Sequence, residues 1–200
     1  MISVVLPECL TYIGRFSFYN CASLTTINFP ENITEIGDNA FSATSITGDI
    51  NLPNLEALGT GVFRDTKISS VTSLGKITIL KSSSTNFSVF SGCTNLSLVN
   101  LPETLVEIGT AVFNNCTSLE KIEIPENVTT IKDSVFSGCT NLKMAIVNPT
   151  TPPTAGGNMF YNTHADLKIY VPNDSVEAYK EATNWSNYAD KIHPMSEYAE

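Results

Sequence analysis

The chain has 200 residues, of which 42% are hydrophobic, and its 10 Phe, 7 Tyr and 1 Trp supply enough apolar volume for a folded core. The formal net charge of −9 argues against attraction to phosphate backbones or anionic membranes, so nucleic acid is not expected as a partner. Because only 16% of the residues are charged, the surface is expected to be mostly neutral and hydrogen-bonding, which suits contact with carbohydrate or protein.

A short apolar motif that ends in proline recurs along the chain. Its copies are Val4–Pro7, Ile27–Pro30, Ile50–Pro53, Val99–Pro102 and Ile122–Pro125, with prolines spaced by 23, 23, 49 and 23 residues. The longest gap holds one divergent copy, Ile77–Leu80, in which Leu80 takes the place of the proline. Apolar residues at alternate positions predict a short half-buried strand, and proline ends it because proline lacks a backbone donor.

A second marker keeps the same period. Most of the prolines are followed eleven residues later by a phenylalanine, and these are Phe18, Phe41, Phe63, Phe90, Phe113, Phe136 and Phe160. Glycines such as Gly37 and Gly109 recur between the two markers, where a turn needs positive φ or a close backbone approach. A helical turn or 3-10 segment is then expected to carry each Phe into the core.

The period itself predicts the architecture. A coil of about 23 residues cannot bury its own apolar face, so successive coils must stack and share one continuous core. The sequence therefore predicts a repeat solenoid.

The best copies of the unit, Ile27–Phe41 (INFPENITEIGDNAF) and Ile122–Leu142 (IEIPENVTTIKDSVFSGCTNL), resemble the repeat of BspA-like leucine-rich repeat proteins, a family of bacterial surface proteins. The resemblance covers about residues 2–147, and residues 167–179 are similar to the closing segment of that family. It implies an α/β repeat solenoid that is right-handed, with short parallel strands, short helical or 3-10 convex segments and a C-terminal cap.

We expect a single continuous domain. Residues 1–147 would form the solenoid, with about six coils, and residues 148–200 an irregular connection, the last strand and the cap.

One coil departs from the period. Phe63 and Leu80 are 17 residues apart instead of the usual 12, which places five extra residues around Ser69–Gly75, in a loop or kink. The following Lys81–Asn86 is polar where other coils carry Pro-Glu and an apolar residue, so this coil is expected to be the least stable. The insertion is either a tolerated loop or a loop that contacts a ligand.

The two ends of the chain carry different signals. Asp174 and Glu177 predict a capping box and a short helix over about 175–183, after which Trp185 and neighbouring apolar residues would cover the open end of the core. The alternative for Trp185 is a platform that stacks on a ligand. At the other end the chain runs straight into the first strand, so we expect a fragment of a longer protein. Neither a signal peptide nor a membrane-spanning run is visible in the sequence.

Cysteines follow several of the repeat phenylalanines by three residues. Cys93, Cys116 and Cys139 would form a column about 5 Å apart, the spacing of neighbouring strands. We expect buried free thiols, because Thr44 and Thr66 fill the same position in other coils, and a disulfide between adjacent coils is the alternative.

Catalytic and metal-binding patterns are not apparent. One Cys per coil lacks the paired spacing of a structural zinc site, and neither His164 nor His193 stands in a nucleophile motif. We therefore expect no catalytic residue, no metal and no cofactor.

The outward positions of the predicted strands remain as the candidate ligand-binding surface. Counted back from each proline or its equivalent, they form two mostly polar columns on the concave face: Thr26 and Asn28, Asp49 and Asn51, Lys76 and Thr78, Leu98 and Asn100, Lys121 and Glu123, and Lys168 and Tyr170. A rigid ladder of this kind can contact an extended partner at a low ordering cost. The alternative is a solvated sheet face without a partner.

These observations predict a noncatalytic recognition module. The resemblance implies a secreted or cell-surface bacterial protein, such as an adhesin that binds a host or microbial surface protein or glycan. A structural spacer that presents another domain is the alternative. A hydrolase would need a compact site in the insertion or in the tail.

Overall fold

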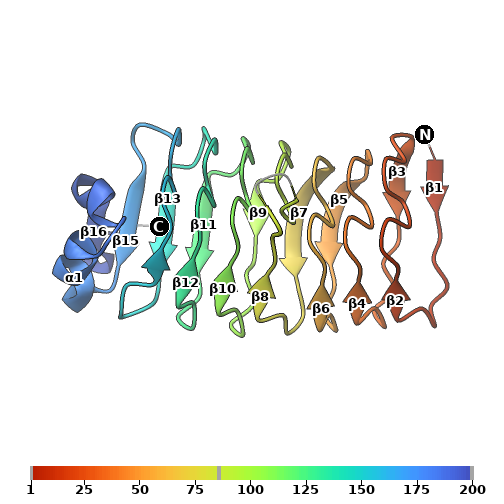
Figure 1. Ribbon diagram of the computed structural model, residues 1–200, viewed down its shortest axis with the longest axis horizontal. Coiled ribbons are helices and arrows are strands. Elements are labelled where there is room, and N and C mark those ends of the chain that lie inside the picture. Colours follow the sequence, from red (N-terminus) through yellow and green to blue (C-terminus); the bar gives the residue numbers. More distant parts are fainter. Residues whose placement is uncertain (1, 85–86, 199–200) are drawn as a thin grey trace.

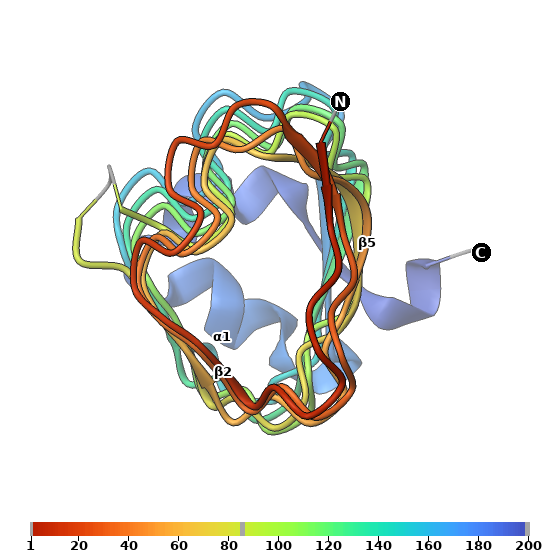
Figure 2. The ribbon, with the colours of Figure 1, turned by 90° about the vertical axis from the view of Figure 1, so that its right-hand side faces the viewer.

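The computed structural model describes residues 2–84 and 87–198, which form a solenoid of about eight turns. The turns stack along a nearly straight axis (Figure 1). Each turn places one strand in each of two walls, which enclose the core when the molecule is viewed along its axis (Figure 2).

The first wall is called the long-strand face. Its strands are β1 (Ile2–Val4), β3 (Leu24–Ile27), β5 (Thr47–Asn51), β7 (Lys67–Ser73), β9 (Leu98–Val99), β11 (Lys121–Ile124), β13 (Met144–Val147), β15 (Lys168–Val171) and β16 (Ile192–Pro194). They pair in parallel in the orders β1-β3, β5-β7-β9 and β11-β13-β15-β16. The parallel strands expected before each proline are therefore confirmed.

The second wall, the short-strand face, is absent from the sequence-based prediction. Its strands are β2 (Tyr12–Ile13), β4 (Glu35–Ile36), β6 (Ala57–Leu58), β8 (Ile79–Leu80), β10 (Glu107–Ile108), β12 (Thr130–Ile131) and β14 (Thr154–Ala155). They form the parallel sheets β2-β4-β6 and β8-β10-β12-β14. Each has two residues, too few to show the alternation that marks a strand in sequence.

One hydrophobic core runs through the solenoid. The repeat phenylalanines stack from Phe18 to Phe160, with ring centroids 5.2 to 5.8 Å apart and ring planes within 10° of parallel. Phe41, Phe113 and Phe136 are fully buried in the same cluster. The prediction of a continuous shared core is confirmed.

The expected helical or 3-10 segments before each Phe are wrong. Before residue 173 the described chain forms turns there, because two residues in most coils adopt positive φ and interrupt any helical run. In the coil of Phe113 these residues are Ala111 and Asn115, with φ of 55° and 58°.

The register expected for the coil after Phe63 is also wrong. Ile79–Leu80 is not a strand of the long-strand face but β8, which pairs with β10. The long strand of that coil is β7, where Val71 pairs with Ile50 of β5. The extra residues therefore lie between Leu80 and Phe90, where one loop projects from the stack in Figure 2, and not around Ser69–Gly75.

Coiling continues past residue 147, where an irregular connection was expected. The strand β14 pairs with β12, and the ring of Phe160 stacks on that of Phe136 at 5.3 Å. After β15 the chain forms η1 (Asn173–Ser175), α1 (Val176–Glu181), η2 (Ser186–Lys191) and η3 (Met195–Glu197). The short helix is present, but the expected capping box is not, since α1 has no side-chain cap hydrogen bond.

Aromatic side chains cover the C-terminal end of the core. Tyr179 and Trp185 are fully buried, with ring centroids 4.9 Å apart. Trp185 Nε1 donates to the carbonyl oxygen of Pro153 at 2.8 Å, and the Tyr179 hydroxyl donates to that of Pro149 at 2.7 Å. The indole of Trp185 is thus packed inside the protein rather than presented to a ligand.

Candidate functional site

The central part of the long-strand face is polar and open. Asp49 and Asn51 of β5 are exposed, as expected. The carboxylate of Asp49 accepts hydrogen bonds from Ser70 Oγ at 2.8 Å and Thr72 Oγ1 at 2.5 Å, which ties β5 to β7. Ser70 and Thr72 were not among the predicted site residues, because the long strand of that coil was expected at Ile77–Leu80 and not at β7.

Lys76 and Thr78 do not belong to this face. They lie between β7 and β8, and Lys76 lines a cavity of about 320 Å³ with Asn32, Asn54 and other residues that precede the short strands. The alternating apolar residues of Ile77–Leu80 are typical of a long strand, but β8 pairs with β10 and so belongs to the short-strand face.

The asparagines of the predicted columns differ in their surroundings. Asn28 is half-buried and faces the preceding coil, where its Oδ1 accepts from the Leu6 backbone N–H at 2.6 Å and its Nδ2 donates to the Leu6 carbonyl at 3.3 Å. Asn28 therefore holds two coils together. Thr26 remains exposed beside it.

Asn100 is exposed and lies between two hollows at the edge of the long-strand face. One, of about 310 Å³, also includes Thr72 and Glu103, and the other, of about 250 Å³, includes Glu103 and Glu123. Asn100 Nδ2 donates to the Thr72 carbonyl at 3.4 Å, and the amide group also carries an oxygen that can accept hydrogen bonds. We call Asp49, Asn51, Thr72, Asn100 and Glu123 the polar strip.

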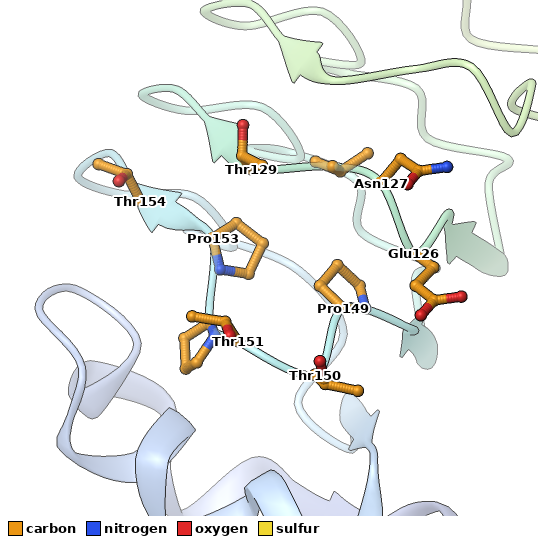
Figure 3. Close-up of a pocket in the computed structure, with 10 residues that line it drawn as sticks. Glu126, Asn127, Thr129, Pro149, Thr150, Thr151, Pro153 and Thr154 are labelled. Carbon is orange, nitrogen blue, oxygen red and sulfur yellow. The ribbon is translucent and has the colours of Figure 1, made fainter.

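A third hollow follows the same edge toward the C-terminal end. Its volume is about 390 Å³, and it lies between two neighbouring coils. Figure 3 shows the residues that line it, which include Glu126, Asn127, Thr129, Pro149, Thr150, Pro153 and Thr154. Glu126 is its one charged side chain, so the hollow offers hydrogen bonds to neutral groups rather than an acid and base pair.

The C-terminal part of the long-strand face is less polar. Lys121 and Lys168 are exposed, as expected, but Tyr170 is only 5% exposed. Its ring packs against those of His193 and Tyr198, with centroids 5.9 and 5.4 Å away. Tyr170 is thus brought into contact with the tail, which the repeat pattern gave no means of foreseeing.

The remaining candidate of the C-terminal part, Glu123, is bridged to the next strand. Its Oε1 accepts from Asn148 Nδ2 at 2.9 Å. Asn148 was missed because residues beyond 147 were expected to leave the coil.

The cysteine column is built into the core. Cys93, Cys116 and Cys139 are free and buried, and each Sγ lies 3.0 to 3.2 Å from the carbonyl oxygen of the Phe in the preceding coil. Burial raises the pKa of the Cys93 and Cys139 thiols from 9.0 to about 12 and that of Cys116 well above 9.0. Protonated thiols donate hydrogen bonds here and are poor nucleophiles.

Metal-ligating side chains do not cluster in the part of the chain that the structure describes, where no group of three His, Cys, Asp or Glu could hold an ion. His164 and His193 lie 3.8 and 3.1 Å from carboxylates of their own segments, Asp166 and Glu197. Over residues 2–84 and 87–198, no helix is long and apolar enough to cross a membrane.

A solved structure shows a similar fold, and its comparison with this chain stands beside a second, more distant one. A leucine-rich repeat protein from Bacteroides ovatus is 25% identical, with a TM-score of 0.67, over 96% of this chain and 53% of that one. A leucine rich cell surface protein from Faecalibacterium prausnitzii is 21% identical, with a TM-score of 0.40, over 92% of this chain and 61% of that one. This chain thus spans about half of the Bacteroides chain. No curated protein matches it significantly.

The sequence profile of BspA type leucine rich repeat regions matches residues 1–88 and 72–188, in six copies. These ranges include the stacked phenylalanines and both walls of the solenoid. The chain therefore belongs to the BspA type leucine-rich repeat family.

Proposed function

We propose that this chain is a noncatalytic recognition module that binds a protein or glycan through the polar strip of its long-strand face. The observation that carries the proposal is the position of Asn100, an exposed amide between two hollows on a rigid wall. Strands that are already ordered reduce the entropy lost on binding, and neutral donors and acceptors suit hydroxyl and amide groups of a partner.

The partner would be a host or microbial surface molecule, and the protein would act as an adhesin, secreted or at the cell surface of a bacterium. This follows from the resemblance of its repeats to those of BspA-like surface proteins. Labelling of intact cells with an antibody against the solenoid tests this location, and signal that requires lysis would contradict it.

Two features of the architecture belong to the same proposal. The coil is right-handed, because connections between parallel strands of one sheet are right-handed in about 98% of cases. Residues 1–147 and 148–200 form one continuous domain, since the phenylalanine stack crosses that boundary.

The experiment that tests the function replaces Asn51 and Asn100 with Ala and measures binding to arrayed glycans and to surface-protein extracts. Both side chains are exposed, so the fold should stay intact while binding falls at least about tenfold, the loss of one or two hydrogen bonds to a partner. Asn95→Ala, which changes an exposed asparagine outside the polar strip, is the matched control. Unchanged binding with an intact fold would favour the spacer role.

A further inference from the structure

The last residues of the described chain turn back onto the long-strand face. After β16, the segment η3 lies outside the wall of long strands in Figure 2. Lys121 Nζ donates to the Tyr198 hydroxyl at 2.9 Å and lies 5.2 Å from the centre of its ring. These two residues are 77 positions apart in the sequence.

The surface under Tyr198 differs from the rest of the face. Met144 of β13 is in register with Lys121 on one side and Lys168 on the other, and Ile146 is in register with Tyr170. The outward side chains of these strands are therefore Lys121 and Glu123 of β11, Met144 and Ile146 of β13, and Lys168 and Tyr170 of β15, so that Met144 lies between two lysines and Ile146 lies between Glu123 and Tyr170. We call Lys121, Met144, Ile146, Lys168 and Tyr170 the aromatic platform.

Burial shows that the platform is occupied. Ile146 and Tyr170 occupy outward positions, yet they are only 7% and 5% exposed. The Tyr198 ring meets the Tyr170 ring at 60°, an edge-on arrangement that aromatic pairs favour. Tyr198 is itself half-buried by this contact.

Acidic residues stand beside Tyr198 in the sequence of the tail. Glu197, next to Tyr198, accepts a contact from His193 Nδ1 at 3.1 Å. Glu197 precedes Tyr198 and Glu200 follows it two residues later in the sequence, and the platform carries Lys121 and Lys168. Lys121 lies over the Tyr198 ring, which contributes a cation–π attraction.

We infer that the aromatic platform is a binding site for a segment of another protein that carries a tyrosine beside acidic residues, and that the chain's own tail occupies this site in the free protein. The platform is part of the long-strand face, and the inference names a class of partner for that face, so it rests on the proposed recognition function. The tail is the stand-in ligand: Tyr198 marks where the partner's ring lies, and Lys121 marks the donor to its hydroxyl.

The tether sets a limit on affinity. A segment joined by a short linker has an effective concentration on the order of millimolar. The tail occupies the platform at this effective concentration, so its Kd for the platform cannot be much above that value. The same peptide added in solution should therefore bind an emptied platform with a Kd of about 1 mM or tighter.

The test uses the full chain with Tyr198→Ala, which empties the platform, and a capped peptide of residues 194–200 (PMSEYAE). Binding is followed by NMR shifts of the Met144 methyl and Tyr170 ring signals. The Tyr198→Ala chain should bind the peptide at least about twofold more tightly than the unaltered chain, whose own tail competes. Equal thermal midpoints of the two chains show that the fold is kept.

Peptide variants separate the contacts without changing the protein. The Tyr198→Ala peptide should not bind, and the Tyr198→Phe peptide should bind several-fold more weakly, because it lacks the hydroxyl that Lys121 contacts. Lys121→Ala in the Tyr198→Ala chain should weaken binding of the tyrosine peptide to a similar degree. Lys132→Ala is the matched control, because Lys132 pairs with Glu107 beside the short-strand face.

Three results would overturn the inference. The first is that the Tyr198→Ala chain fails to bind the tyrosine peptide at several millimolar, and the second is that the alanine peptide binds equally well. The third is that the unaltered chain dimerises and Tyr198→Ala makes it monomeric, which would assign the platform to a second copy. Changes at Asn51 and Asn100 leave the platform intact, so failure of the polar strip and failure of the platform are distinguishable.

Discussion

Two positions in most coils set the path of the backbone. One of these positions of positive φ follows the repeat Phe by two residues, and its φ lies between 54° and 78°. It is occupied by Asn20, Ala43, Asp65, Gly92, Asn115, Gly138 and Asn162. Apart from Ala43, these are the residue types that enter the left-handed region at the lowest cost. The residue types at this turn are therefore visible in the sequence, although the repeated glycines led us to expect positive φ at other positions.

The glycines that recur between the two markers act by close backbone approach, one of the two roles expected for them. Gly37, Gly59 and Gly109 do not have positive φ. A Cβ on Gly59 would lie 2.4 Å from the backbone N of Asp38, and one on Gly109 would lie 2.6 Å from the carbonyl oxygen of Leu80. Adjacent coils touch at these points, so a side chain has no room.

The cysteine column makes a prediction at this scale. Cys116→Ala removes the thiol that contacts the Phe90 carbonyl and leaves a small void, so the free energy of unfolding should fall by about 1–2 kcal/mol. Cys116→Thr should cost less, because Thr44 and Thr66 occupy the same position and donate to the carbonyls of Phe41 and Phe63. Urea denaturation of the two variants measures the difference. Equal losses would show that the hydrogen bond contributes nothing.

Among the elements, the loop between β8 and Phe90 is the clearest departure from the repeat. The repeat period predicts five extra residues in this coil, but it places them before β8, because Ile77–Leu80 has the apolar alternation of a long strand. Alternation alone cannot distinguish the two walls. Pairing of Leu80 with Ile108, and of Val71 with Ile50, settles which strand belongs to which wall.

The same loop should be the least protected part of the central coils. Phe87 is 42% exposed, and its N–H donates to the Ser84 carbonyl while the Ser83 N–H donates to the Phe87 carbonyl, so these bonds stay within the loop. In the coils of Val99–Leu142, by contrast, amides such as those of Phe113 and Asn115 donate to the next coil. Amides of Lys81–Ser84, the described part of the polar segment expected to be least stable, should exchange with deuterium faster than those of Val99–Leu142. Uniform protection across both segments, measured by hydrogen exchange, would contradict this.

At the scale of the molecule, the continuous core predicts that a change in one coil is felt by its neighbours. Phe113 stacks at 5.6 Å on both Phe90 and Phe136 and is fully buried, so Phe113→Ala should lower the free energy of unfolding by about 3–5 kcal/mol.

Phe18 provides the comparison, because it lies at the end of the stack, is half-buried and contacts one repeat phenylalanine, Phe41. Phe18→Ala should cost clearly less than Phe113→Ala in the same denaturation experiment. If the two losses are equal, stability does not come from stacking along the core.

The repeat period by itself determined the solenoid, its parallel strands and the column of buried phenylalanines, because one coil of this size cannot hide its apolar side chains without a neighbour. The sequence also placed Asp49, Asn51 and Asn100 on the outward side of their strands, since alternation fixes direction within a strand. These inferences depend on local pattern alone.

The tertiary structure decided which coils and residues become neighbours. The register of β7, the bridge from Asp49 to Ser70 and Thr72, and the return of Tyr198 to Lys121 all depend on how separate parts of the chain are aligned in space. A periodic sequence allows more than one alignment of equivalent apolar residues, and it carries no period in the tail. Packing selects among those alignments, and for this reason the platform under Tyr198 became visible only in the folded chain.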